Sequence, residues 1–418
     1  MSTFERHVLD NGLRILTANL PYAQSVTCMV MIAAGSRYET PETNGIAHFS
    51  EHMFFKGTER RPDARAIAGE IDSIGGEFNA FTSKESTAYF VRCAADHRDV
   101  ALDVLVDMLR NSRFDSGEID REKGVIVEEM NMYFDTPRDY IGGVYDELLY
   151  GDQPLGWDII GKKETVRAAT RETFMGYLER WYHPERMVVG IAGRIGDDAV
   201  EQVSALLGDL PASTTGAPSP VQGYMNGRVK VFTKASDQAH VVVGVPSYPL
   251  EHPDRYALQM LATVLGGGMS SRLFTEVRER RGLAYYVYGV NHSYTDAGSL
   301  YSQAGVDITR IDEALRTIAT ELKGMTTAVP AEELEKARSF SKGRFVLQLE
   351  NPQGLISFGL RKEVLEGRAP DPEEVLAGIS AVTAEDVQRV AQDLLAEDKL
   401  RVAVIGPFDD AERFEKLL

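Results

Sequence analysis

Two segments, Thr170–Gly193 (TRETFMGYLERWYHPERMVVGIAG) and Thr383–Gly406 (TAEDVQRVAQDLLAEDKLRVAVIG), follow the same pattern 213 positions apart. Each begins with Thr-x-Glu, a frequent start of a helix, continues with an apolar stripe, and ends with a short β-like run and Gly. Asp99–Leu102 and Asp312–Leu315 repeat at the same offset. Several matches at one offset predict a duplicated domain of about 210 residues.

The segment between the two copies has a different composition. Residues 210–223 (LPASTTGAPSPVQG), near the middle of the chain, are rich in Pro, Ser, Thr and Gly. Such a composition is typical of an extended, solvated linker. We therefore expect an N-terminal domain over residues 1–209 and a homologous C-terminal domain over residues 224–418.

The pattern of secondary structure is alike in the two halves. Short β-like runs alternate with longer segments in which apolar residues recur every three or four positions, as in amphipathic helices. No glycine-rich phosphate-binding turn follows the first strand, so the pattern favours an α+β fold with helices on one face of each sheet. The clearest predicted strands are Val26–Ala33, Ser86–Cys93, His240–Val245 and Ser299–Val306, and the clearest helices are Arg98–Asn111 and Ser116–Phe134.

The composition is that of a folded chain. Of its 418 residues, 43% are hydrophobic and 26% are charged, which excludes disorder as the main state. The formal net charge of −18 repels phosphate, so we expect neither nucleic acid nor a membrane as a partner, whereas basic peptides would be attracted. Residues 1–10 do not resemble a secretory signal, and no apolar run reaches the ~18–20 residues that span a bilayer, so we expect a cytoplasmic location.

Residues 44–55 (NGIAHFSEHMFF) combine apolar residues at helical spacing with two histidines and a glutamate. On a helix, His48 and His52 lie one turn apart on the same face, and Glu51 shares that face. Two imidazoles so placed can both bind one Zn²⁺, while the carboxylate reaches a water on that ion. This His-x-x-Glu-His order is the reverse of the commoner His-Glu-x-x-His. It predicts a catalytic zinc site that still needs a third ligand.

The expected helix from Ser116 onward supplies candidates for that ligand. Glu122 and Glu129 are seven positions apart, and therefore two turns along one face of a helix. Glu128 points ~100° away from Glu129 around the same helix. Helical periodicity alone does not decide between Glu128 and Glu129, and a glutamate on a helix is more often simply solvated.

Taken with this motif, several other segments resemble the inverted-zincin peptidases of the pitrilysin and mitochondrial-processing-peptidase family. The resemblance covers essentially the whole chain, and so many motifs in one order make it specific. The segments that carry it are Leu9–Arg14, Gly45–Thr58, Asn79–Ser83, Glu122–Met130, Gln153–Gly156, Leu265–Gly268 and Arg278–Tyr285.

The resemblance implies a zinc endopeptidase with two homologous α+β domains, each a mostly antiparallel sheet covered by helices. One Zn²⁺ per chain is expected, bound only in the first domain. His48 and His52 match the family's metal ligands, Glu51 matches its general base, and alignment of the third ligand selects Glu129. Glu122 then matches the acid that supports the site from behind.

The resemblance also implies how substrate is bound. Asn79 and Ala80 match the strand edge that pairs with the substrate backbone. Arg278 and Tyr285 match a pair that the second domain directs towards the substrate carbonyl. Related chains of this length generally pair into a chamber, so we expect a homodimer that hydrolyses short or unfolded peptides.

Two other functions fit the same fold. A non-catalytic structural homologue would keep the architecture and lose the metal, and a presequence-binding homologue would leave cleavage to a partner chain. The intact set of His48, Glu51, His52 and Glu129 argues against the first of these. Zinc content and cleavage by the isolated protein would distinguish the presequence-binding homologue from a zinc endopeptidase.

Overall fold

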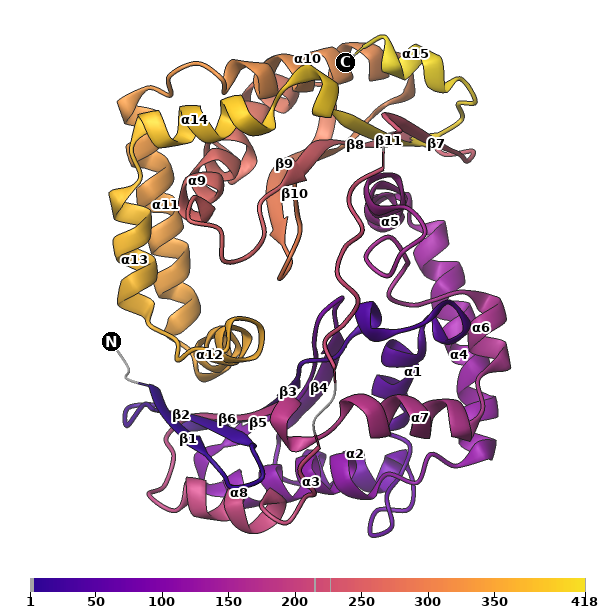
Figure 1. Cartoon of the computed structure of the whole chain (residues 1–418), viewed down its shortest axis with the longest axis vertical. Coiled ribbons are helices and arrows are strands. Elements are labelled where there is room, and N and C mark those ends of the chain that lie inside the picture. Colours follow the sequence, from indigo (N-terminus) through magenta and orange to yellow (C-terminus); the bar gives the residue numbers. More distant parts are fainter. Residues whose placement is uncertain (1–3, 214–215, 226, 418) are drawn as a thin grey trace. The chain divides into compact units, whose positions relative to one another are not determined.

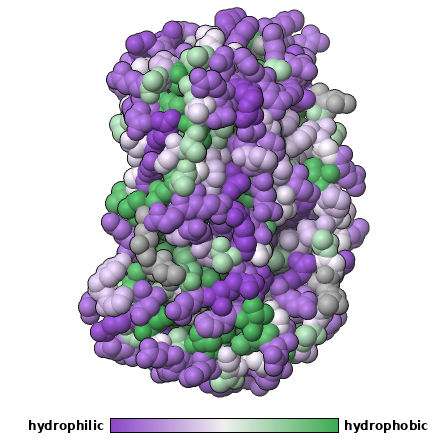
Figure 2. All heavy atoms as spheres, turned by 60° about the vertical axis from the view of Figure 1, so that its left-hand side comes forward, coloured by the Kyte–Doolittle hydropathy of each residue, from purple (hydrophilic) through white to green (hydrophobic). Residues whose placement is uncertain are grey.

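The computed structural model describes residues 4–213, 216–225 and 227–417 of the chain (Figure 1). Residues 214 and 215 of the expected linker, and 1–3, 226 and 418 of the expected domains, lie outside the described residues. None of the helices in this described part is long and apolar enough to cross a membrane. Hydrophilic residues predominate on the face drawn in Figure 2, where hydrophobic residues form separate small groups.

The chain divides into two compact units, each with its own β-sheet. Each unit is built from three stretches of the sequence. The first unit comprises Met1–Met130, Asp158–Ser219 and Val346–Pro372. The second unit comprises Asn131–Trp157, Pro220–Phe345 and Glu373–Leu418.

The sheet of the first unit has six strands in the order β1-β2-β6-β3-β5-β4. All neighbouring pairs are antiparallel except β2 and β6, which run parallel. β4 therefore lies at one edge of this sheet. The strands are β1 (Phe4–Val8), β2 (Arg14–Asn19), β3 (Ser25–Ile32), β4 (Glu77–Thr82), β5 (Thr87–Ala94) and β6 (Met187–Gly193).

The sheet of the second unit has five strands in the order β7-β11-β8-β10-β9. Only β7 and β11 run parallel, and β9 lies at an edge as β4 does in the first sheet. The strands are β7 (Val229–Thr233), β8 (Gln238–Ser247), β9 (Ala284–Ser293), β10 (Gly298–Asp307) and β11 (Arg401–Gly406).

The two sheets have the same strand order once β1 is set aside. The duplicated segments account for the parallel pairs, because each forms a helix followed by a strand: α7 (Arg171–Trp181) with β6, and α14 (Ala384–Leu394) with β11. Thr170 and Thr383 begin these helices with the same capping box. The prediction of an α+β fold with two mostly antiparallel sheets is thus confirmed, and the six predicted elements agree with the observed ones to within two residues at each end.

Helices cover one face of the first sheet and bury its main core. Along β3, Val26, Cys28, Val30 and Ile32 alternate towards this helical layer, as the two-residue period of a strand requires. The helices of the first unit are α1 (Ile46–Met53), α2 (Ala64–Ser73), α3 (Arg98–Asn111), α6 (Lys163–Ala168), α7, α8 (Ala199–Leu207) and α12 (Pro352–Glu366), together with most of α4 (Ser116–Asp135).

The second unit repeats this arrangement with its own core beneath α9, α10 and α14. A π-helical turn, Phe274–Arg280, leads into β9. The helices of this unit are α5 (Pro137–Tyr150), α9 (Arg255–Gly266), α10 (Ile311–Gly324), α14 and α15 (Ala411–Glu415), with most of α11 (Ala331–Leu349) and α13 (Pro372–Ala381).

The expectation of helices on only one face of each sheet is wrong. In the first unit α12 packs against the opposite face, where Met29 and Met31 of β3 contact Leu355 and Ile356 among others. Contact is so close that a Cβ on Gly190 of β6 would lie 2.5 Å from Ile356 Cγ1. α5 covers the corresponding face in the second unit. β3 (SVTCMVMI) is mostly apolar and is buried from Val26 to Ile32, and this near-continuous run is the sequence signal for the second layer.

The covering helices come from distant parts of the sequence. α12 belongs to the C-terminal half of the chain but to the first unit, and α5 belongs to the N-terminal half but to the second. The two compact units therefore exchange segments, whereas the boundaries 1–209 and 224–418 describe the repeat in the sequence. Those domain boundaries stay a prediction.

Candidate metal centre

Helix α1 presents both histidines of the motif on its polar side. Its apolar residues Ile46, Phe49 and Met53 are buried in the core, so the two histidines turn the other way. The N-cap of the helix is Gly45, whose φ of +96° favours glycine, and a Cβ there would lie 2.7 Å from the carbonyl oxygen of Ile160. Local sequence thus fixes both the start and the rotation of α1.

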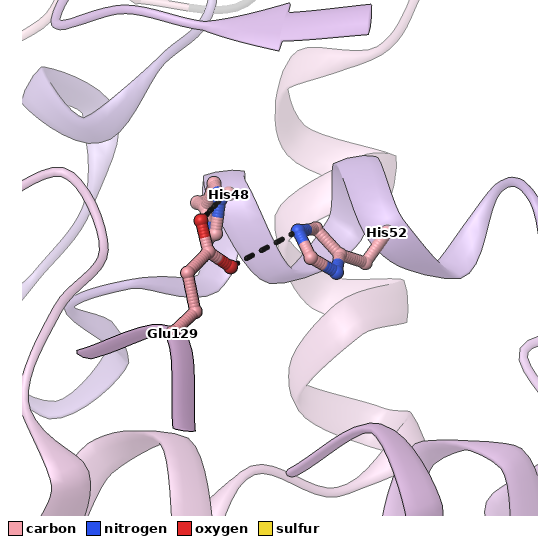
Figure 3. A group of neighbouring side chains, drawn as sticks. All are labelled: His48, His52 and Glu129. Atoms are coloured by element: carbon pink, nitrogen blue, oxygen red, sulfur yellow. Dashed lines mark ion pairs between the residues drawn. The ribbon is translucent and has the colours of Figure 1, made fainter. Parts of the chain in front are cut away.

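His48, His52 and Glu129 converge, as Figure 3 shows. Nε2 of His48 and Nε2 of His52 each lie 3.6 Å from a carboxylate oxygen of Glu129, which α4 supplies. One candidate ligand atom from each residue lies within 4.8 Å of the others. These separations are too long for hydrogen bonds and suit atoms that surround a common ion. Two imidazoles and one carboxylate form a set that binds Zn²⁺ and leaves a fourth position open.

The two imidazoles are held differently. His48 is largely buried, and burial, with a smaller contribution from the nearby His52, lowers its pKa to about 3. A neutral imidazole is the form that binds a metal. Nδ1 of His48 is buried without a hydrogen-bond partner within the described residues. Nδ1 of His52 instead lies 2.9 Å from Oε1 of Glu122, an arrangement that leaves Nε2 of His52 free to face Glu129.

Glu122 lies behind this site, in contact with His52. Its other carboxylate oxygen forms an ion pair of 2.6 Å with Nζ of Lys56. Burial alone would raise the pKa of Glu122, but the hydrogen bonds from His52 and Lys56 outweigh it and lower that pKa. The carboxylate of Glu122 is thus held ionised. Beside it, Nε2 of His52 has to carry no proton in order to bind a metal.

Glu51 lies beside the three converging residues, close enough for the charges of His52 and Glu129 to act on its pKa, and it contacts β4. Oγ1 of Thr82, the last residue of β4, donates a short hydrogen bond to Oε2 of Glu51. Burial raises the pKa of Glu51, against the opposing hydrogen bond from Thr82. A carboxyl group with a raised pKa is suited to exchange protons near neutral pH. Thr82 and Lys56 had no expected role, although both lie inside segments that carry the family resemblance.

The structure distinguishes between the two neighbouring glutamates of α4. Glu129 belongs to the converging group, whereas the side chain of Glu128 is exposed and does not. Their divergence around the helix is the one that the 100° step between successive residues requires. The geometry therefore agrees with the alignment that selected Glu129.

Asn79 and Ala80 lie on β4, the edge strand. The backbone N–H of Ala80 donates to Oδ1 of Asn79 at 2.8 Å rather than to the neighbouring strand β5. This N–H accordingly faces outward from the sheet. An unpaired strand edge of this kind can accept an extended peptide.

Arg278 and Tyr285 lie in the second unit, next to each other. Nη1 of Arg278 donates to the carbonyl oxygen of Tyr285 at 2.7 Å, and the guanidinium group lies 5.3 Å from the centre of the Tyr285 ring. Tyr285 is 73% exposed, so it is not a core aromatic residue of that unit. The arrangement leaves the phenol group available to a ligand.

Comparison with known proteins identifies the family. Residues 14–162 match the family model described as insulinase (peptidase family M16), and residues 168–340 match that of the peptidase M16 inactive domain. An uncharacterized zinc protease of Bacillus subtilis (strain 168), YmxG, is 38% identical over 406 residues, which cover 96% of this chain and 98% of that protein. The chain belongs to peptidase family M16. This confirms the family resemblance seen in the sequence motifs.

Other M16 relatives are similar over nearly their whole length. An uncharacterized zinc protease of Rickettsia felis is 34% identical over 403 residues, covering 96% of this chain and 97% of the relative. The crystal structure of a protease from Helicobacter pylori superposes with a TM-score of 0.88 over 97% of this chain and all of that one, at 22% identity. At that identity the superposition supports the M16 fold alone. The match to the inactive domain lies mostly in the second half of the chain, whereas the candidate metal cluster of His48, His52 and Glu129 lies in the first unit.

Proposed function

We propose that this M16 protein is a zinc endopeptidase that hydrolyses peptide bonds in short or unfolded peptides, with one Zn²⁺ bound by His48, His52 and Glu129. The observation that carries the proposal is the convergence of three ligand atoms of the right chemistry. Relatives named zinc proteases support the choice of metal. Glu122 would orient His52 through the Nδ1 contact.

Zinc bound in this set would supply Lewis acidity, making a water more acidic and polarising the scissile carbonyl group. Glu51 is next to the site on α1, and its raised pKa suits a group that takes up a proton and gives it back. It would accept a proton from the attacking water and return it to the leaving amine. Thr82 would hold the carboxylate of Glu51 in place through its hydrogen bond.

The edge strand β4 would bind the substrate backbone. A substrate carbonyl would accept a hydrogen bond from the outward N–H of Ala80, replacing the side chain of Asn79. Binding as an added strand requires an extended chain, which favours short or unfolded peptides. The net charge of −18 favours basic ones.

Arg278 and Tyr285 would contribute from the second unit. A phenol O–H and a guanidinium group are donors suited to a developing oxyanion, and both residues are exposed to solvent.

Assembly into a homodimer and a cytoplasmic location also stay predictions. Sedimentation of the purified protein and fractionation of cells would test them.

The test is to assay the purified protein for bound metal and for cleavage of an unbiased peptide mixture. We expect one zinc per chain and cleavage that a chelator abolishes and added zinc restores. The variant Glu51→Gln should retain zinc and lose ~10²–10⁴-fold in turnover, because it keeps the ligands and removes the base. Zinc binding without any cleavage by the wild type would instead support a peptide-binding homologue.

A further inference from the structure

The buried carboxylate of Glu39 lies against the start of α1. Its Oε2 accepts hydrogen bonds from the backbone N–H of Gly45 at 2.8 Å and from Nδ2 of Asn44 at 3.0 Å, and its Oε1 accepts from the N–H of Ala47 at 2.8 Å. Glu39 is only 5% exposed. Burial raises its pKa to about 8, whereas all three of these contacts are donors and favour the ionised carboxylate.

Helix α1 has no cap of its own. The residue at its N-cap position is Gly45, which has no side chain to accept the unpaired N–H groups of the first turn. Glycine is favoured there by its φ of +96° and by the close approach of Ile160. Glu39, six residues earlier in the chain, takes over the role that a serine or aspartate would have at an ordinary N-cap.

The first turn of α1 matters for the metal because it contains a ligand. The helix has only eight residues, and His48 is the third of them. Short helices are marginal by themselves, and their ends fray first. His52 is also fixed by Glu122, but Nδ1 of His48 has no hydrogen-bond partner within the described residues. The direction of His48 therefore depends on the backbone that carries it.

We propose that Glu39 is a positioning residue for the metal centre: by capping the first turn of α1, it keeps His48 where His52 and Glu129 can bind the same ion. The inference rests on the proposed function, since it takes zinc to be bound by these three residues. Glu39 acts through the backbone of α1, because it accepts hydrogen bonds from the N–H groups of Gly45 and Ala47 and none from a ligand.

The test compares two buried glutamates of the first unit. In Glu39→Gln one acceptor oxygen becomes an amide NH₂ that faces another donor, so at least one cap bond is lost. The control is Glu363→Gln on α12, where a fully buried carboxylate accepts hydrogen bonds from Arg6 and Arg14. Both variants should lower the melting temperature of the metal-free protein. Only Glu39→Gln should raise the zinc dissociation constant. The expected increase is about 10–100-fold, as is usual when a residue that orients a metal ligand is changed.

Glu39→Asp provides the second variant, because it keeps two acceptor oxygens and shortens the side chain by one methylene. It should fold, and its zinc affinity should lie between those of the wild type and Glu39→Gln. Wild-type zinc affinity in both Glu39 variants, with only a lower melting temperature, would overturn the inference and leave the proposed function intact. A wild-type protein that binds no zinc would overturn both. Zinc binding is measured by competition with a chelator and therefore does not depend on peptidase activity.

Discussion

The regions around α1 and α9 occupy matching places in the two units and do different things. Each helix packs beside the edge strand of its own sheet, α1 beside β4 and α9 beside β9. In the second unit this contact is between backbones, since a Cβ on Gly266 would lie 2.0 Å from the backbone nitrogen of Gly289. In the first unit side chains lie between α1 and β4, and the hydroxyl group of Thr82 donates a hydrogen bond to Glu51.

Under the proposed function, this difference allows one fold to hold a metal site in one unit and only core packing in the other. α9 buries eight of its twelve residues, all of them apolar or glycine, so it contributes to the core. α1 is shorter, buries only one face and keeps its polar side for His48, Glu51 and His52. Within the described residues, the only group of side chains suited to a metal lies in the first unit. The architecture supplies a helix beside an open strand edge, and the side chains decide whether that place has chemistry.

Among the changes that compare the two units, the largest effect is expected at Tyr285. It tests whether the second unit takes part in the chemistry although it lacks metal ligands. Tyr285→Phe should lower turnover by ~10²–10³-fold, because one donor to the oxyanion would be lost. Zinc content and melting temperature should not change, since the side chain is exposed. Tyr22→Phe, which alters another exposed tyrosine, is the control. Normal turnover in Tyr285→Phe would confine the chemistry to the first unit.

A smaller effect is expected where α1 meets the edge strand of the first unit. Thr82→Val removes the hydrogen bond to Glu51 with little change in shape and should lower turnover about tenfold, the equivalent of ~1.4 kcal/mol. Zinc affinity should stay the same. Thr82→Ser keeps the hydroxyl group and should recover most of the turnover. If serine and valine behaved alike, the hydroxyl group would not position Glu51.

The smallest effect on catalysis is expected where α9 meets the edge strand of the second unit. Gly266→Ala should lower the free energy of unfolding by ~1–3 kcal/mol, because its Cβ would overlap the backbone of Gly289. Gly343→Ala on α11 is the control, as its Cβ would meet no atom within 4 Å. Zinc content should be normal in both variants, and chemical denaturation measures the difference. Equal free energies of unfolding in the two variants would mean that Gly266 and Gly289 do not lie in close contact.

Local patterns in the sequence predict much of this molecule. Helical and strand periods placed the main elements, and the spacing of His48 and His52 put both on one face of α1, because such patterns depend only on neighbouring residues. The second layer on each sheet was not predicted, since α12 and α5 come from the other half of the sequence.

The finer parts of the site depend on contacts between distant residues. Glu39 reaches α1 across a turn, and Thr82 reaches Glu51 from another element, so no periodicity in one segment reveals them. The choice between Glu128 and Glu129 was open from helical spacing alone, and the rotation of α4 in the folded unit distinguishes them.

The central claim is that zinc binds to His48, His52 and Glu129, and the most direct test is the zinc content of two neighbouring variants. Glu129→Gln removes a ligand from the converging group, whereas Glu128→Gln makes the same chemical change one residue away on the exposed side of α4. After dialysis against a weak chelator, Glu128→Gln should retain about one zinc per chain, and Glu129→Gln should retain almost none. Zinc retained by Glu129→Gln and lost by Glu128→Gln would contradict the account.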